Sequence, residues 1–156
     1  MKAEAIGCTL FSIFVMILLL APLIGVSSLS ASSNVIAPPP TDDAEVCELS
    51  PDCNYGMNTI IWVESAGCGR NRRTFMKFDL SALPPGAIIT EARLCLYCQE
   101  ANFADLNVQV RAVDNDYWAE CAITWSNQPP YGEVLDNTTI AKCASFRWYC
   151  WDVTSF

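Results

Sequence analysis

Hydrophobic and polar residues alternate with a period of two along several short runs of the chain. One parity of residues 75–80 is wholly apolar, and residues 92–97 and 106–112 alternate in the same way. Such alternation is typical of β-strands with one buried face. Glycine- and proline-rich turns separate the runs, as in AGCGRN at 66–71 and LPPG at 83–86, and no run has the pattern of a long helix. The pattern therefore predicts an all-β fold, an antiparallel β-sandwich of the jelly-roll kind.

The N-terminal segment has a different pattern. Residues 6–26 carry no charge, Lys2 precedes them, and small residues follow at 27–33. This is typical of a secretory signal peptide, which predicts a secreted, extracellular protein. The alternative is an uncleaved membrane anchor, since about 20 apolar residues can span a bilayer. We interpret residues 1–33 as the signal or anchor, 34–41 as a Ser/Pro linker and 42–156 as the folded domain.

Composition excludes several functions. The formal net charge of −8 repels phosphate backbones, so we expect no nucleic-acid partner. The chain has no histidine, which removes Ser-His and Cys-His nucleophile pairs and the commonest metal ligand. No other pair of a nucleophile and a base stands out, so the sequence predicts a protein that is not an enzyme.

Cysteines are frequent, and their number predicts disulfides. Apart from Cys8 in the N-terminal segment there are eight, an even number behind an export signal. The alternative, thiolate-bound zinc, rests on a single CxxC motif at 95–98. A local bond between Cys47 and Cys53 is predicted, because CELSPDC contains Pro51 and can turn back on itself.

Strand parity predicts a second bond and an exposed tryptophan. If Leu96 and Trp151 point inward, Cys95 and Cys150 point outward, and they can bond if their strands are neighbours. The same parity turns Trp148 outward. An exposed indole is a candidate platform for a sugar ring, which presents an apolar C–H face; the alternative is that a loop covers it.

Five short motifs occur in order along the predicted domain. They are NYG at 54–56, RTFMKFDLSALPPGAIITEARLCLY at 73–97, W-x-E at 118–120, ITWSNQP at 123–129 and WDVT at 151–154. Together they resemble the DNRLRE domain, also called the disaggregatase-related repeat, which is classed with carbohydrate-binding module family 96.

The resemblance covers about residues 41–154. It implies a jelly-roll β-sandwich, export, and attachment to polysaccharide-degrading or cell-surface proteins. The family usually continues with further strands after the D-V-T motif, so the resemblance also implies a domain that lacks its C-terminal strands. The cysteines are an addition to the family pattern.

The run TWSNQPPYG at 124–132 has two interpretations. In one, Trp125 fills the core at a corner of the fold, as large aromatic side chains are usually buried. In the other, the run is a rim loop whose Asn127, Gln128 and Tyr131 contact sugar hydroxyls, since loops at sandwich ends often carry binding residues.

Two charged clusters are further candidates. The arginines Arg70, Arg72 and Arg73 would recognise the carboxylates of an anionic sugar, or would only solubilise a hairpin loop. The carboxylates of Asp114, Asp116 and Glu120 would hold a structural calcium ion, or would form a solvated turn. No cofactor is required by either interpretation.

These features predict a secreted, disulfide-stapled and non-catalytic module that binds polysaccharide. The alternative is a structural or adhesive surface protein. In that case the missing strands leave an open sheet edge, through which copies of the chain self-associate. Membrane contact is expected only through an uncleaved N-terminal segment.

Overall fold

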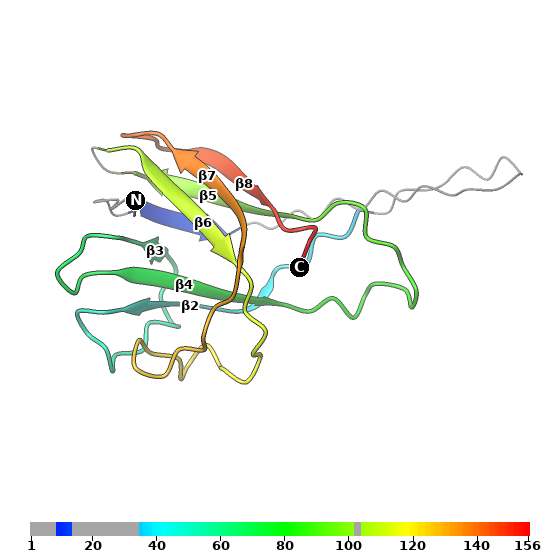
Figure 1. The fold of residues 1–156 in the computed structure, drawn as a ribbon, viewed down its shortest axis with the longest axis horizontal. Helices are drawn as coiled ribbons and strands as arrows, with labels where there is room; N and C mark the ends of the chain where they lie inside the picture. The colour runs from blue at the N-terminus through cyan, green and yellow to red at the C-terminus, as the bar shows by residue number, and fades with distance from the viewer. Residues whose placement is uncertain (1–8, 14–34, 102–103) are drawn as a thin grey trace, which may run out of the picture.

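The computed structural model of the chain describes residues 9–13, 35–101 and 104–156. The described residues contain strands and loops and no helix (Figure 1). The strands are β1 (Thr9–Ile13), β2 (Pro40–Cys47), β3 (Ile61–Val63), β4 (Arg72–Phe78), β5 (Arg93–Glu100), β6 (Leu106–Arg111), β7 (Val134–Ile140) and β8 (Arg147–Asp152). Within these ranges, no helix is long and apolar enough to cross a membrane.

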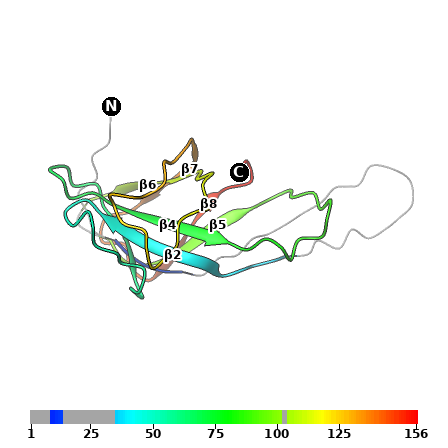
Figure 2. The same ribbon diagram turned by 90° about the horizontal axis from the view of Figure 1, so that it is seen from below.

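The strands form three antiparallel sheets. One has four strands in the order β3-β1-β5-β8, and the pairs β2-β4 and β6-β7 form two-stranded sheets. Figures 1 and 2 show the β6-β7 ribbon lying in a layer in front of the four-stranded sheet. The predicted all-β antiparallel sandwich is confirmed.

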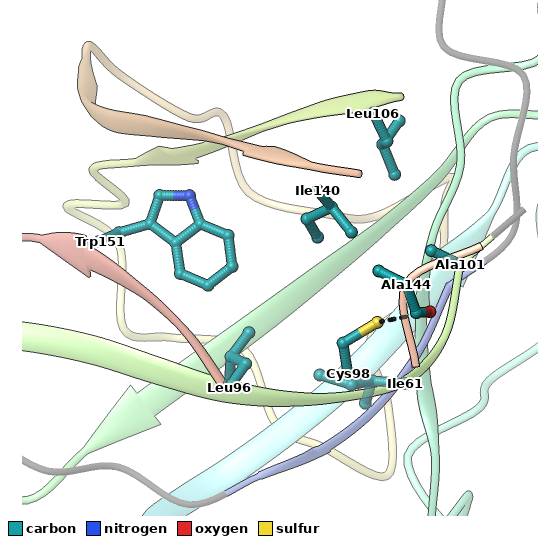
Figure 3. Packing of buried hydrophobic residues seen from close by; sticks show 8 residues of the cluster. All are labelled: Ile61, Leu96, Cys98, Ala101, Leu106, Ile140, Ala144 and Trp151. Atoms are coloured by element: carbon teal, nitrogen blue, oxygen red, sulfur yellow. Dashed lines mark hydrogen bonds between the residues drawn. The ribbon is translucent and has the colours of Figure 1, made fainter. Parts of the chain in front are cut away.

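The main core lies between these two layers. Its buried side chains come from β3, β5 and β8 on one side and from β6, β7 and adjoining loops on the other (Figure 3): Ile61, Leu96, Cys98, Ala101, Leu106, Ile140, Ala144 and Trp151. Trp151 is completely buried, and its indole N–H donates a hydrogen bond of 2.9 Å to the Val108 carbonyl. The inward orientation predicted for Leu96 and Trp151 is confirmed.

A second core lies on the β2-β4 sheet. Ala44, Val46 and Phe75 pack there against Trp118 and Ile123 of the long segment between β6 and β7. Met76, the neighbour of Phe75, points to the opposite face and packs against the main core. Both faces of β4 are therefore covered, and the prediction of a half-buried strand at 75–80 is wrong, because a loop distant in sequence covers the second face.

The cysteine predictions had opposite outcomes. Cys95 and Cys150 are directly opposed on β5 and β8 and form a disulfide, with Cα atoms 4.1 Å apart. The predicted Cys47–Cys53 bond is not formed in the structure. Cys47 is buried at the end of β2, whereas two successive turns, closed by Ser50 N–H to Cys47 O and Cys53 N–H to Ser50 O, bring Cys53 to the surface.

Three strands lie where the alternation gave no signal. β2 begins at Pro40, inside the predicted linker, and β7 occupies a polar stretch. The predicted signal at 1–33 lies outside the described residues except for Thr9–Ile13, which forms β1 between β3 and β5. The export signal itself stays a prediction.

Candidate functional site

The face of β4 that carries the second core also carries an arginine, which lies against two aromatic rings. The guanidinium carbon of Arg73 lies 4.3 Å from the Trp125 ring centroid and 4.9 Å from that of Tyr131. Its Nη1 donates a hydrogen bond of 2.9 Å to Gln128 Oε1. A cation over an aromatic face is attracted by the ring quadrupole, so these contacts hold the Tyr131 ring beside the strand.

A second arginine reaches the same ring from β6. The guanidinium carbon of Arg111 lies 5.3 Å from the Tyr131 centroid. Its two Nη atoms donate to Gly132 O at 3.0 Å and to Gln109 Oε1 at 3.2 Å. We call Arg73, Arg111, Trp125, Gln128 and Tyr131 the Tyr131 cluster. The Tyr131 side chain remains 42% exposed, so the cluster opens to solvent.

The charge of the cluster is unusual for this acidic protein. In the described part of the chain, the ion pairs within 4.0 Å use Arg72, Lys77 and Arg93, and none uses Arg73 or Arg111. Both guanidinium groups are thus bonded to amide or carbonyl oxygens and not to carboxylates. A guanidinium without a carboxylate can still form the paired hydrogen bonds that match an anionic ligand.

The loop that supplies the cluster is held in a fixed shape by its own polar side chains. Asn127 accepts a hydrogen bond from Thr124 N–H at 2.6 Å and donates one to Ala122 O at 3.0 Å. Gln128 Nε2 donates to Trp125 O at 2.7 Å. Asn127 therefore serves mainly to shape the loop, whereas Gln128 links the loop to Arg73.

Lys77 attaches the segment between β6 and β7 to β4. Its Nζ donates to the Trp118 carbonyl at 2.7 Å and lies 4.8 Å from the Trp118 ring centroid. The segment also borders an open depression of about 220 Å³, whose lining includes Tyr117, Asn127 and Pro129. The fully exposed Tyr117 ring adds an aromatic surface at this depression.

The other two predicted arginines lie elsewhere. Arg72 points to the opposite face of β4, where it pairs with the buried Glu45 at 2.9 Å and with Glu64 at 3.5 Å. Burial raises the pKa of Glu45 above its usual value, although the Arg72 charge opposes the rise. Arg70 is exposed in the β3-β4 hairpin loop and has no described contact with the cluster.

Trp148 lies on the four-stranded sheet. It is 48% exposed, so its predicted outward orientation is confirmed. It sits directly opposite Tyr97 on β5, with ring centroids 5.3 Å apart in an edge-to-face arrangement. The predicted ligand surface therefore divides into two, the Tyr131 cluster and a Trp148 face made of Tyr97 and Trp148.

The structure does not assemble the predicted acidic cluster into a metal site. Asp114 and Asp116 are exposed, and the Asn115 side chain caps the turn by accepting from Tyr117 N–H at 2.8 Å. The Glu120 backbone N–H instead donates to Asp42. Among the described residues, no group of three or more histidine, cysteine or acidic side chains is placed to hold a metal ion.

Of the Tyr131 cluster, the sequence indicated Arg73, Gln128 and Tyr131 as candidates but not Arg111. Arg111 lies on the polar face of β6 together with Asn107 and Gln109. This alternation indicates that the Arg111 side chain is exposed, but it does not indicate what the side chain contacts. Only the return of the loop between β6 and β7 brings Arg111 to the ring of Tyr131.

Comparison with known proteins found a similar protein and a matching family. A gellan lyase from a Bacillus species is 33% identical to the chain over 120 residues. The matched part covers 74% of this chain but only 5% of that protein, so the chain spans about a twentieth of the relative's length. Residues 35–156, almost the whole of the described domain, match carbohydrate-binding module family 96. The chain therefore belongs to carbohydrate-binding module family 96.

Proposed function

We propose that the domain is an extracellular, non-catalytic module that binds a polysaccharide through the Tyr131 cluster. The observation that carries this proposal is a half-exposed tyrosine ring contacted by two guanidinium groups, neither of which forms an ion pair with a carboxylate of the described residues. An aromatic face accepts the C–H side of a sugar ring, and the guanidinium groups and the Gln128 amide supply hydrogen bonds to its oxygens.

The electrostatics of the cluster favour an acidic polysaccharide. Two guanidinium groups that form no ion pair with the described part of the chain lie on a protein of net charge −8, so the cluster attracts an anion that the rest of the surface repels. The match to a small part of a gellan lyase also supports an accessory role beside a catalytic domain. Gellan is accordingly the first polysaccharide to test.

Affinity electrophoresis of the oxidised protein in gels that contain gellan, other acidic polysaccharides or neutral polysaccharides tests the proposal. We expect acidic polysaccharides to retard the protein, and we expect the retardation to weaken as salt rises, because salt screens exposed charges. Tyr131→Ala should abolish most of the retardation. Phe156→Ala, which removes another exposed aromatic ring, is the matched control and should change nothing.

Two results would overturn the proposal. One is the absence of retardation of the wild-type protein by every polysaccharide. The other is release of new reducing ends or unsaturated sugars, which would show that the domain cleaves its ligand. Retardation that Trp148→Ala abolishes and Tyr131→Ala leaves intact would move the site to the Trp148 face.

A second candidate function rests on the position of β1. This strand lies between β3 and β5, outside the 35–156 family match and inside the predicted signal. Removal of the signal would leave the facing edges of β3 and β5 without a strand, and unpaired edges can accept a strand of another chain. Adhesive assembly would then appear as concentration-dependent oligomers of the processed chain in analytical ultracentrifugation, and a monomer at all concentrations would exclude it.

A further inference from the structure

Two exposed cysteines outside the Tyr131 cluster lie on chain segments that run side by side. Cys53 belongs to the segment that follows β2, and Cys121 belongs to the turn that follows Trp118. Both side chains are exposed. Figure 1 shows the two segments, coloured teal and gold, together along the lower edge of the molecule.

Hydrogen bonds join the two segments on both sides of each cysteine. The side chain of Asn54 donates to the carbonyls of Glu120 at 2.8 Å and Ile123 at 2.7 Å, which flank Cys121 in sequence. On the other side of Cys53, the carboxylate of Asp52 accepts from Ser126 Oγ at 2.8 Å. The residues before and after Cys53 are thus each bonded to the segment that carries Cys121.

The backbones of the segments are in direct contact. Gly56 is buried, and a Cβ atom added there would overlap the carbonyl of Glu120. The conformation next to each thiol is also fixed, because Cys53 N–H donates to Ser50 O at 3.1 Å and Ala122 N–H donates to Ala119 O at 3.0 Å. Little chain entropy remains to be lost when a bond forms between segments held in this way.

The other unbonded cysteines are not comparable partners. Cys47 and Cys98 are buried, while Cys68 and Cys143 are exposed in the β3-β4 and β7-β8 loops. No hydrogen bond among the described residues connects either of those loops to residues 51–56 or 119–127.

We propose that Cys53 and Cys121 form a second native disulfide of the oxidised protein. One thiolate attacks a small-molecule disulfide such as oxidised glutathione, and the other then displaces the second glutathione from the mixed disulfide. The protein thiols lose two electrons and two protons, and one oxidised glutathione becomes two reduced ones. The bond would tie the loop that carries Trp125 and Tyr131 to the end of β2, and it does not depend on the proposed binding function.

Disulfide mapping tests the proposal directly. The full chain is purified oxidised, its free thiols are blocked with N-ethylmaleimide in denaturant without reduction, and its proteolytic peptides are identified by mass spectrometry. We expect a peptide pair joined through Cys53 and Cys121, with neither residue alkylated. Alkylation of either cysteine in the wild-type protein, or its recovery in a bond to a different cysteine, would overturn the proposal.

Single variants provide an independent readout. Cys53→Ser should convert Cys121 from unlabelled to fully labelled, and Cys121→Ser should do the same to Cys53. Cys143→Ser, which removes another exposed cysteine, is the control and should leave both unlabelled. The double variant should lower the melting temperature no more than either single variant, because the first change already removes the bond; a further drop would contradict the pairing.

Discussion

The two exposed aromatic surfaces of the domain are built in different ways. The Trp148 face lies on paired strands, with Trp148 opposite Tyr97, the Cys95–Cys150 disulfide two positions along, and the buried Trp151 behind the sheet. The Tyr131 cluster lies where a long loop crosses the β2-β4 sheet, and cation–aromatic contacts and side-chain hydrogen bonds to backbone groups hold it in place.

The Trp148 face and the Tyr131 cluster differ in what holds them in place and in the role that we propose for them. Strand pairing and a disulfide fix the Trp148 face. The Tyr131 cluster brings two guanidinium groups to one tyrosine ring and bonds the Gln128 amide to one of them, a combination that suits the polar, ring-shaped ligand proposed for it. Five predictions test this difference between the two surfaces.

The largest effect is expected from Trp151→Ala. The indole is completely buried between the layers, and emptying such a site costs about 3–5 kcal/mol of unfolding free energy. Trp148→Ala, on the same strand but exposed, should stay within about 0.5 kcal/mol of the wild type. Urea denaturation followed by circular dichroism measures both, and equal losses would show that Trp148 is part of the core.

Arg72→Ala should have the next largest effect, and Arg73→Ala a much smaller one. The first change leaves the Glu45 carboxylate buried and unpaired, a situation that typically costs about 3–5 kcal/mol; the partial exposure of Arg72 favours the lower end. Arg73→Ala removes contacts of the cluster and leaves no buried charge. Adding Glu45→Gln to Arg72→Ala should restore part of the lost stability in denaturant titrations, and a double variant less stable than Arg72→Ala would refute this account.

The disulfide should stabilise the Trp148 face without serving the Tyr131 cluster. Replacing Cys95 and Cys150 together by serine should lower the unfolding free energy by about 2–4 kcal/mol, as is typical of native disulfides. Well below its melting temperature the variant should still bind polysaccharide like the wild type. Loss of binding by the folded variant would place the ligand on the Trp148 face.

The sequence predicts what depends on local alternation. Parity along 146–154 places Trp151 inward and Trp148 outward, and parity along two strands pairs Cys95 with Cys150. The strands β2 and β7 carry acidic and polar residues and exist because they pair with β4 and β6, so no local pattern indicates them. The loop that packs on the second face of β4 likewise comes from a distant part of the chain, since Trp118 lies 41 residues after Lys77, which donates a hydrogen bond to it.

The candidate site shows the same limit. Arg72 and Arg73 are neighbours on one strand and must point to opposite faces, so parity alone separates the buried ion pair from the ligand candidate. By contrast, the meeting of Arg73 and Arg111 at one ring requires the path of the loop between β6 and β7. Trp125 is half-buried and packs on the second core, as predicted for a corner of the fold, and it also lies against Arg73, which no local pattern indicates.

Tyr131→Ala tests whether the Tyr131 cluster, and not the Trp148 face, binds the polysaccharide. Loss of one aromatic platform with its cation contacts corresponds to about 1–2 kcal/mol, or roughly a tenfold weaker affinity. Stability should fall by less than about 1 kcal/mol, because the ring is half-exposed. Isothermal titration calorimetry with the polysaccharide that retards the wild type measures the affinity, and Trp148→Ala is the matched comparison, expected to bind unchanged.

The smallest effect concerns pH and the anchoring of the loop beside the Tyr131 cluster. Asp42 accepts a hydrogen bond from Glu120 N–H at 3.1 Å and pairs with Lys77 at 3.3 Å, and these contacts hold its pKa below the usual 3.8. A carboxyl whose pKa is lowered by folding stabilises the folded state above the unfolded-state value, and this contribution is lost as the pH falls through the folded-state value. The unfolding free energy of the wild type should therefore decline below about pH 4 partly through Asp42, and Asp42→Asn should make that decline shallower.

Chemical denaturation between pH 2.5 and 7 measures the slope, with Asp114→Asn as a control, because Asp114 is exposed and accepts no described hydrogen bond. Equal slopes in the wild type and Asp42→Asn would show that Asp42 does not anchor the loop through its charge.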